Sequence, residues 1–252
     1  MREFDRGYSE VTFSKIAELL KPQEAIIHKE YHLSTADPAL VGIDNVRPVG
    51  NTNYDIADQL ADVGMEAIHP KASKPLEMAG IHLRIKNTFE PSHPGTLITR
   101  EYVSTLKRVE VITGTDQLLL IDIYDPLMVG NVGSDLQIMQ LFFNHRVSYT
   151  FKATSANSIS IVIWETDFKQ ALIDDLENAF EKVTVEPVAM VCLLGTNMDQ
   201  PGLLANAATA LAKSDINILS AGIALRKVNI QFLIAREQFK TAIIALNKAL
   251  GQ

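Results

Sequence analysis

An internal repeat constrains the fold of this 252-residue chain more than any other feature of its sequence. Residues 168–173 read Phe-Lys-Gln-Ala-Leu-Ile, and residues 239–244, which lie 71 positions later, read Phe-Lys-Thr-Ala-Ile-Ile. Before each copy comes an apolar run typical of a buried strand, at 118–124 and at 189–194, and a loop that contains glycines follows it. A chain with this pattern is expected to fold as two similar small units.

Both copies predict the same order of elements. After the apolar run, apolar residues recur at helical spacing in 136–143 and in 203–211, with Ser134 or Asp135 as the candidate N-cap in the first copy. Two strand-like segments follow, and the Phe-Lys helix closes each copy. The order β-α-β-β-α is typical of a ferredoxin-like α+β sandwich. Short strands at 109–112 and 183–185 are expected to complete the sheets.

The first hundred residues have a different pattern. Amphipathic helices are expected at 11–20, where Ser9 is the candidate N-cap, and at two later segments, 55–63 and 71–79, which end near Gly64 and Gly80. Short strands are expected at 25–27, 81–86 and 97–99, and residues 100–107 resemble a linker. Alternating strands and helices of this kind indicate part of a three-layer α/β fold.

Composition excludes several classes of protein. The chain has 23 Lys and Arg against 30 Asp and Glu, a net charge of -7, and no long basic cluster, so neither a nucleic acid nor an anionic membrane is an expected partner. A single cysteine, Cys192, excludes an intramolecular disulfide framework. With no apolar run of about 20 residues and no signal-peptide pattern at the N-terminus, we expect a soluble cytoplasmic protein.

Few residues carry chemistry by pattern alone. The segment 6–10, Arg-Gly-Tyr-Ser-Glu, opens a helix, where backbone N–H groups and Arg6 could hold a carboxylate; the alternative is a capping serine beside a solvated arginine. The six histidines form no pattern typical of a metal site, so no metal is expected. Cys192 lies in an apolar strand and is expected to be an inert core thiol. There is no glycine-rich nucleotide-binding motif.

Four motifs taken together resemble the C-terminal part of an aspartate kinase. Residues 6–10 resemble the family's Arg-Gly-Gly-Ser-Asp, and 35–38 its Thr-Ala-Asp-Pro. Residues 64–70 resemble Gly-Ala-Lys-Val-Leu-His-Pro, and Lys-Asn-Thr-Phe followed by Gly-Thr-Leu-Ile, within 86–98, resembles the family's closing segment. The repeated tail is similar to the family's paired ACT domains, which bind small ligands and regulate the kinase.

The resemblance implies a fold and its boundaries. An α/β partial amino-acid-kinase domain is expected at 1–102, followed by tandem α+β ferredoxin-like ACT domains at 108–182 and 183–252. It also implies dimerisation, because the edge strand of a small sheet pairs readily with a second copy. A homodimer through the ACT domains is therefore expected.

The resemblance further implies phosphoryl transfer from ATP, with Mg²⁺, to the side-chain carboxylate of L-aspartate, a step that depends on positioning and charge stabilisation. ATP is a substrate of the complete enzyme, and no tightly bound cofactor is expected. The residues that match the family's substrate contacts are Arg6, Ser9 and Glu10. Those that match its nucleotide contacts are Ser34, Thr35, Asp37, Pro38 and Glu66.

Several positions depart from the family pattern. Ser34 replaces a tyrosine, Ala39 an arginine and Glu66 a lysine, which puts the usual nucleotide pose in question. These departures resemble the aspartate kinases associated with ectoine synthesis. The family's N-terminal segment Lys-Phe-Gly-Gly-Thr-Ser has no counterpart in the chain. We therefore expect a C-terminal portion that has no kinase turnover by itself.

By resemblance, an amino-acid effector would bind where ACT domains meet. The residues expected there are Val129, Gly130, Asn131, Gly133, Thr154 and Ser155, although the loop 129–133 could equally be a plain turn. Ala156 and Thr150 occupy the positions of two expected acidic residues. Since a buried ammonium group without an anion is costly, lysine is expected to bind weakly or not at all.

A second function stays open from the sequence. The chain could be a non-catalytic ACT-bearing regulatory subunit that binds an amino-acid effector or a partner kinase chain.

Overall fold

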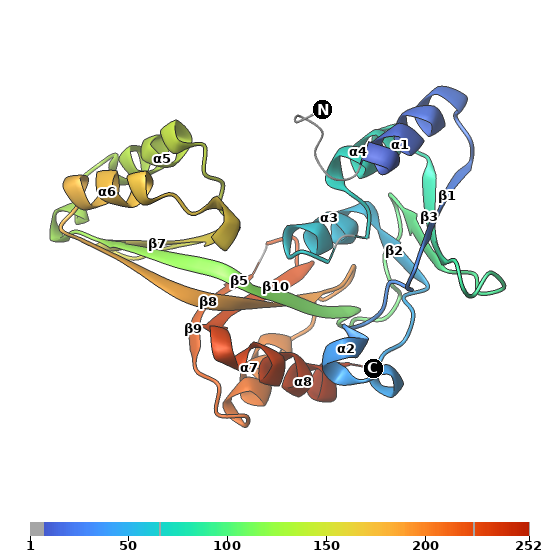
Figure 1. The fold of residues 1–252 in the computed structure, drawn as a ribbon. Helices are drawn as coiled ribbons and strands as arrows, with labels where there is room; N and C mark the ends of the chain where they lie inside the picture. Colours follow the sequence, from blue (N-terminus) through green and yellow to red (C-terminus); the bar gives the residue numbers. More distant parts are fainter. Residues whose placement is uncertain (1–7, 66, 224, 252) are drawn as a thin grey trace. The chain divides into compact units, whose positions relative to one another are not determined.

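The computed structural model describes residues 8–65, 67–223 and 225–251 (Figure 1). The chain divides into two compact units. The first takes the chain up to Gly114, Val191–Phe232 and the stretch from Lys240 onward, and the second takes Thr115–Met190 and Leu233–Phe239. The domain boundaries that the sequence predicts stay predictions.

A four-stranded mixed sheet forms the N-terminal part of the first unit. Its strands are β1 (Glu24–Lys29), β2 (Asn51–Asn53), β3 (His82–Asn87) and β4 (Thr96–Thr99), in the order β1-β3-β4-β2. β1 runs parallel to β3, and β2 runs parallel to β4, whereas β3 and β4 are antiparallel. Because Lys29 pairs with Asn87, the carboxyl ends of β1 and β3 lie at the same edge. This arrangement confirms the predicted strands.

Three long helices accompany this sheet, α1 (Tyr8–Leu20), α3 (Tyr54–Asp62) and α4 (Pro70–Met78), with two short ones, α2 (Pro38–Val41) and η1 (Ile43–Asn45). α1 contacts α4, and α4 contacts α3. Ser9 lies inside α1, so its prediction as the N-cap is wrong: the helix already includes Tyr8.

Glycines end α3 and α4 as predicted. Gly64 and Gly80 have positive φ values of 82° and 68°, which glycine adopts at little cost. The N–H of the following residue then donates back into the last turn, from Met65 to the Leu60 carbonyl at 2.9 Å and from Ile81 to the Leu76 carbonyl at 3.0 Å. These bonds satisfy carbonyls that a helix end leaves free.

The first unit also contains the end of β8 (Lys182–Leu194), β9 (Ile218–Ile223), most of β10 (Asn229–Ala235), α7 (Leu203–Ala212) and most of α8 (Phe239–Leu250). The 3-10 turn before α8 in the chain, η4 (Arg236–Gln238), belongs to the second unit. Cys192 is fully buried, and burial raises the pKa of its thiol, which agrees with the predicted inert core cysteine.

The second unit is an antiparallel sheet covered by two helices on one face. β5 (Val111–Tyr124) pairs with β7 (Ser158–Trp164), which pairs with β6 (Phe151–Thr154). α5 (Ser134–His145) and α6 (Gln170–Ala179) lie on the same side of these strands (Figure 1). Short 3-10 turns, η2 (Pro126–Met128) and η3 (Glu165–Asp167), connect them. The shared core contains Ile121, Ile123, Ile138, Phe142, Ile159, Ile161, Ile163, Leu172 and Leu176.

Two predictions about this part of the chain are wrong in detail. The segments 109–112 and 183–185 do not form separate short strands, because β5 and β8 each continue through the expected break. Gly114 and Pro187 are turn signals, but strand ends depend on which neighbours continue the hydrogen-bonded ladder. The N-cap of α5 is Gly133, with no side-chain cap, and Ser134 is already helical.

Candidate functional site

Glu10 joins three elements of the first unit. It lies in the first turn of α1, and its Oε1 accepts a hydrogen bond at 2.7 Å from the Nζ of Lys29, the last residue of β1. Its Oε2 accepts at 2.6 Å from the backbone N–H of His69, just before α4. The side chains of Glu10 and Lys29 are 18% and 27% exposed, so water screens this ion pair only in part. The carboxylate is thus held by a cation and an amide at the sheet's edge.

His69 is positioned by its own helix. It is the N-cap of α4, where its Nδ1 accepts from the Lys71 N–H at 3.1 Å, and Pro70 follows it at the first helical position. Proline suits that position because the helix needs no N–H there. His69 therefore has a structural role as the cap of α4, and its backbone N–H donates to Glu10.

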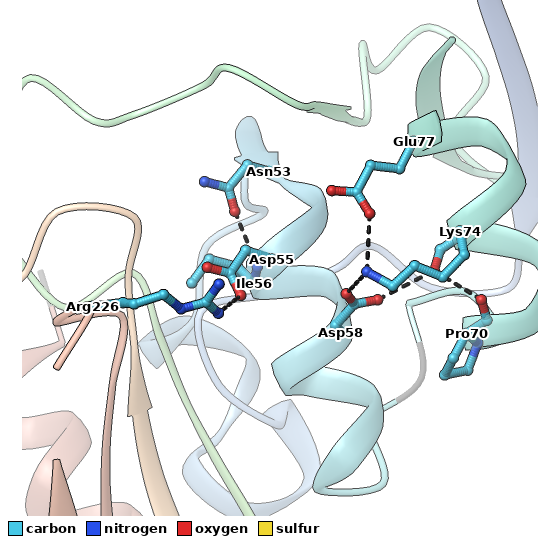
Figure 2. A network of polar contacts seen from close by, with 9 residues as sticks. Asn53, Asp55, Ile56, Asp58, Pro70, Lys74, Glu77 and Arg226 are labelled. Atoms are coloured by element: carbon cyan, nitrogen blue, oxygen red, sulfur yellow. Dashed lines mark hydrogen bonds and ion pairs between the residues drawn. The ribbon is translucent and has the colours of Figure 1, made fainter. Parts of the chain in front are cut away.

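A polar network fixes the start of α4 against α3 (Figure 2). The Lys74 ammonium donates to the Asp58 carboxylate and, at 2.9 Å, to Glu77. The Ser73 hydroxyl is 3.2 Å from both Asp58 Oδ1 and the Pro70 carbonyl. Because Asp58 belongs to α3 and the other residues to α4, the network holds in place the helix end that presents His69 to Glu10.

The start of α3 is held equally firmly. Asn53 caps the helix, accepting from the Ile56 N–H at 3.0 Å (Figure 2). Its amide donates to the Tyr102 carbonyl at 2.9 Å. Arg226, which follows β9, donates to the Asp55 carboxylate. α3 is therefore tied to both the linker and the C-terminal strands of the same unit.

Asn87 and Thr88, at the end of β3, hold the carboxyl ends of β1 and β3 together. The N–H and hydroxyl of Thr88 both donate to the Lys29 carbonyl, at 2.8 and 3.0 Å. Nearby, His32 Nε2 lies 3.2 Å from a Glu90 carboxylate oxygen, and the His32 and His93 rings are 4.3 Å apart. Asn87 and Thr88 thus position the backbone of the residue that holds Glu10.

The four described nucleotide candidates share one turn. Thr35 makes two bonds with Arg47: its N–H donates to the Arg47 carbonyl at 2.9 Å, and its hydroxyl accepts from the Arg47 N–H at 3.1 Å. Ser34 is buried and forms an isolated antiparallel β-bridge with Pro48. Asp37 accepts from the Ala39 N–H at 2.8 Å and so caps α2, which begins at Pro38.

The remaining candidates of the N-terminal part are dispersed or undescribed. Ser9 is exposed in the first turn of α1. Arg6 and Glu66 lie outside the described residues. The structure therefore brings Ser34, Thr35, Asp37 and Pro38 together, and of the predicted substrate residues it gives contacts only for Glu10.

A cavity of about 250 Å³ adjoins Thr35 in the first unit. Arg47, Tyr102, Arg108 and Glu110 also line it. Glu110 is buried, and its Oε2 accepts from the Thr196 N–H at 2.8 Å. Among the residues described, no carboxylate forms an ion pair with Arg47 or Arg108, so the cavity can attract an anion. Neither arginine was predicted from the sequence, because single arginines in loops form no pattern.

In the second unit the predicted effector residues lie at two exposed turns. Val129, Gly130, Asn131 and Gly133 connect η2 to α5, and the Asn131 N–H donates to the Met128 carbonyl at 3.1 Å. Gly130 and Gly133 have φ values of 74° and 103°. The loop therefore has the hydrogen bonding of an ordered turn.

Thr154 is the last residue of β6, and Ser155 follows it at the same end of this unit. The Ser155 N–H donates to the Ser158 carbonyl at 2.8 Å, and the two hydroxyls are 2.9 Å apart. The Asp125 N–H donates to the Asn157 carbonyl at 3.0 Å, which joins the start of the η2 loop to the turn after Ser155. The structure thus brings the two predicted effector segments to one edge.

Among the described residues, no three or more His, Cys, Asp and Glu side chains are grouped so that they could hold a metal ion. In the described part of the chain, every helix is too short or too polar to span a bilayer.

Comparison with known sequences finds relatives that are named as aspartate kinases. Residues 2–87 match the model of the Amino acid kinase family. Aspartate kinase Ask_Ect of Stutzerimonas stutzeri (strain A1501) is 43% identical, over 99% of this chain and 53% of that protein. Aspartokinase 1, chloroplastic, of Arabidopsis thaliana is 27% identical, over 97% of this chain and 44% of that protein. The chain spans about half the length of the curated relatives it matches.

Solved structures share the fold. The aspartate kinase of Clostridium acetobutylicum superposes with a TM-score of 0.88 at 25% identity, covering 98% of this chain and 59% of that one. E. coli aspartokinase III in complex with aspartate and ADP gives 0.86 at 20% identity, over 98% and 56%. The regulatory subunit of aspartate kinase from Thermus thermophilus gives 0.50 at 18% identity, over 57% of this chain and 99% of that subunit.

Proposed function

We infer that this chain belongs to the aspartate kinase family and that the complete enzyme containing it transfers a phosphoryl group from ATP to the side-chain carboxylate of L-aspartate. The observation that carries the proposal is the 43% identity to Aspartate kinase Ask_Ect along 99% of this chain. That identity supports the ectoine-associated subgroup. The fold likeness to an aspartokinase that holds aspartate and ADP supports the same pair of ligands.

In the proposed reaction an oxygen of the aspartate side-chain carboxylate attacks the γ-phosphorus of ATP. A new P–O bond forms, the bond from the γ-phosphorus to the bridging oxygen breaks, and ADP leaves with the electron pair of that bond. Mg²⁺ accompanies ATP as part of the substrate. The protein contributes positioning and charge stabilisation, and no covalent intermediate on the protein is needed.

Within this proposal Arg6 holds an aspartate carboxylate, and Ser9 and Glu10 complete the substrate site. The fixed position of Glu10, between the Lys29 ammonium and the His69 N–H, supports its role because the carboxylate needs no rearrangement before substrate binds. Ser34, Thr35, Asp37, Pro38 and Glu66 border the nucleotide. The cavity beside Thr35, with Arg47 and Arg108 on its walls, supports an anionic ligand there.

The C-terminal part is proposed to be two ACT domains of ferredoxin-like fold, at 108–182 and 183–252, through which two copies form a homodimer. The sequence repeat and the fold likeness to a regulatory subunit support this assignment. An amino-acid effector would bind between the loop 129–133 and the turn at Thr154 and Ser155, whose exposed backbone would face the second copy.

A regulatory chain without catalysis is the second candidate. One observation favours it: the likeness to the Thermus regulatory subunit covers 99% of that subunit. In that case the protein would bind an amino-acid effector or a partner kinase chain and would release no ADP on its own.

A coupled assay of ADP release separates the two proposals. We expect the complete enzyme to form ADP from ATP only when L-aspartate is present, and L-glutamate, which is one methylene longer, to support much less turnover. ADP release that is independent of aspartate would contradict the kinase proposal. If the protein forms no ADP by itself but forms ADP once a separate kinase chain is added, the regulatory candidate is favoured.

A further inference from the structure

A second and larger cavity of the first unit lies away from Glu10. Its volume is about 590 Å³, and it lies between the segment that follows α2 and the C-terminal helix α8. Asp44 and Arg47 line it on the first side, and Asn247 and Lys248 line it from α8. These four polar side chains are brought together across about 200 residues of sequence, which no local pattern predicts.

The charged groups of this cavity lack protein partners. Within the described part of the chain, none of Asp44, Arg47 and Lys248 forms an ion pair. Two cations and one anion leave a net charge of about +1 at neutral pH. A ligand that complements the cavity would carry two negative groups and one positive group.

Asn247 adds an unsatisfied hydrogen-bond acceptor. Asn247 is 8% exposed, and its Nδ2 donates to the Asn45 carbonyl at 3.1 Å. That bond fixes the orientation of the amide, because a flipped amide would place two oxygens against each other. Its Oδ1 has no hydrogen-bond partner among the described residues. A buried oxygen in this state costs free energy unless a ligand or water supplies a donor.

Gly251 keeps space beside this oxygen. A Cβ at position 251 would lie 2.5 Å from Asn247 Oδ1, which is closer than such contacts occur. Glycine therefore avoids a clash with this oxygen, which is itself buried from solvent, and Gly251 lines the cavity. A small donor such as an ammonium group fits this requirement better than a bulky one.

We propose that this cavity binds an acidic amino acid. Its two carboxylates bind Arg47 and Lys248, and its ammonium group binds Asp44 and the Oδ1 of Asn247. The site is distinct from the effector loops of the second unit, and binding there does not depend on kinase activity. The cavity is formed by the segment that follows the Thr35 turn and by α8. A bound ligand would therefore connect these two parts of the chain.

Calorimetric titration of the full protein with L-glutamate tests the proposal. We expect saturable binding to the wild type, and Lys248→Glu to weaken it by at least about tenfold, since a charge-assisted contact is replaced by repulsion. Lys240→Glu is the matched control, because Lys240 is exposed on the same helix and does not line the cavity. Lys248→Arg, which keeps the charge, is expected to retain binding.

Two comparisons sharpen the result. Glutarate, which lacks the ammonium group, is expected to bind more weakly than L-glutamate, and equal affinity would overturn the role of Asp44 and Asn247. Glu10→Gln is expected to leave the affinity unchanged, which separates this cavity from the proposed aspartate site. Binding that Lys248→Glu leaves intact, or no binding of L-glutamate at millimolar concentration, would overturn the proposal.

Discussion

At the scale of single residues, Glu10 is the side chain whose contacts bear most directly on function. Both of its carboxylate oxygens are engaged, one by the Lys29 ammonium and one by the His69 N–H. Hydrogen bonds to charged groups are stronger than those between neutral groups. Replacing the carboxylate should therefore disturb the geometry of α1, β1 and α4 where they meet.

Glu10→Gln tests this role. An amide can accept from Lys29 or from the His69 N–H, but its NH₂ group repels the other donor. We expect kcat/KM for L-aspartate in the complete enzyme to fall by about 10- to 100-fold, from a loss of about 1.5 to 3 kcal/mol. Glu18→Gln is the control, because the ion pair that Glu18 makes with Lys15 is the one the described residues show for it, and it is exposed. Equal kinetics of both variants would argue against the role of Glu10.

Tyr54 makes a buried contact that the unfolding free energy can report. Its hydroxyl donates to the Ile81 carbonyl at 2.6 Å, and the side chain is almost fully buried. Tyr54→Phe leaves that carbonyl without this donor, so the unfolding free energy in urea should fall by about 1 to 2 kcal/mol. Tyr31→Phe, at an exposed position, should change it little. A Tyr54→Phe protein as stable as the wild type would show that the bond contributes nothing.

Residue contacts are what sequence reasoning predicts least. The segment 6–10 could be identified as a candidate substrate site, but the partners of Glu10 lie 19 and 59 residues away. Such contacts depend on strand register and helix packing, which local patterns do not specify. The structural role of His69 was predictable because the proline after it marks the start of a helix.

At the scale of elements, the β3–β4 hairpin depends on one glycine. Gly95 has φ of 74°, and a Cβ there would lie 2.2 Å from the Ile85 carbonyl oxygen. Gly95→Ala should therefore lower the unfolding free energy by about 2 kcal/mol or more, from backbone strain and a steric clash. Gly50→Ala is the matched control, since nothing lies within 4 Å of its Cβ position. Similar thermal midpoints for the two variants would disprove the strain.

A bidentate ion pair joins β1 to β3 and predicts a dependence on pH. Arg84 donates to both oxygens of Glu24, at 2.7 and 2.8 Å, and this hydrogen bonding holds the pKa of Glu24 below its ordinary 4.5. A lowered folded-state pKa stabilises the protein above the unfolded value, and the contribution is lost as pH falls through the folded pKa.

Comparison of the wild type with Glu24→Gln measures that contribution. The wild type should be more stable by up to about 1 kcal/mol at pH 7, as is typical of a partly exposed pair. The difference should shrink as pH falls below 4.5. A difference that stays constant from neutral to strongly acidic pH would mean that another property of the substitution is responsible.

Elements with a clear period were predictable from sequence. Alternation in 81–86 predicted β3, and Gly64 and Gly80 predicted the ends of α3 and α4. The continuous strands β5 and β8 were not predictable, because Gly114 and Pro187 are local turn signals that neighbouring strands override. The same limit applies to the N-cap of α5, where Gly133 takes the place expected for Ser134.

At the scale of the whole molecule, the repeat predicted two similar C-terminal copies, but not which parts of the chain pack together. Residues 191–232 group with the N-terminal part through contacts such as the Ser104 N–H to the Thr196 hydroxyl at 2.9 Å. The side-chain amide of Asn229 donates to the side-chain oxygen of Gln59. These contacts span 92 and 170 residues of sequence, so composition and periodicity do not predict them.

Effector selectivity is a prediction at this scale, and it rests on the proposed ACT assignment. Thr150 and Ala156 supply no anion near the candidate effector turn. We therefore expect L-lysine to bind weakly or not at all in calorimetry, because its ammonium group would lose water without gaining a partner. Micromolar affinity for L-lysine would contradict this expectation.

Direct detection of the phosphorylated product tests the central inference most directly. The complete enzyme, incubated with ATP, Mg²⁺ and L-aspartate, should form an acyl phosphate that hydroxylamine traps as aspartyl hydroxamate. The yield should rise with enzyme concentration and fall sharply in Glu10→Gln but not in Glu18→Gln. If ATP and L-aspartate yield no hydroxamate above the enzyme-free background, the assignment to aspartate phosphorylation is wrong.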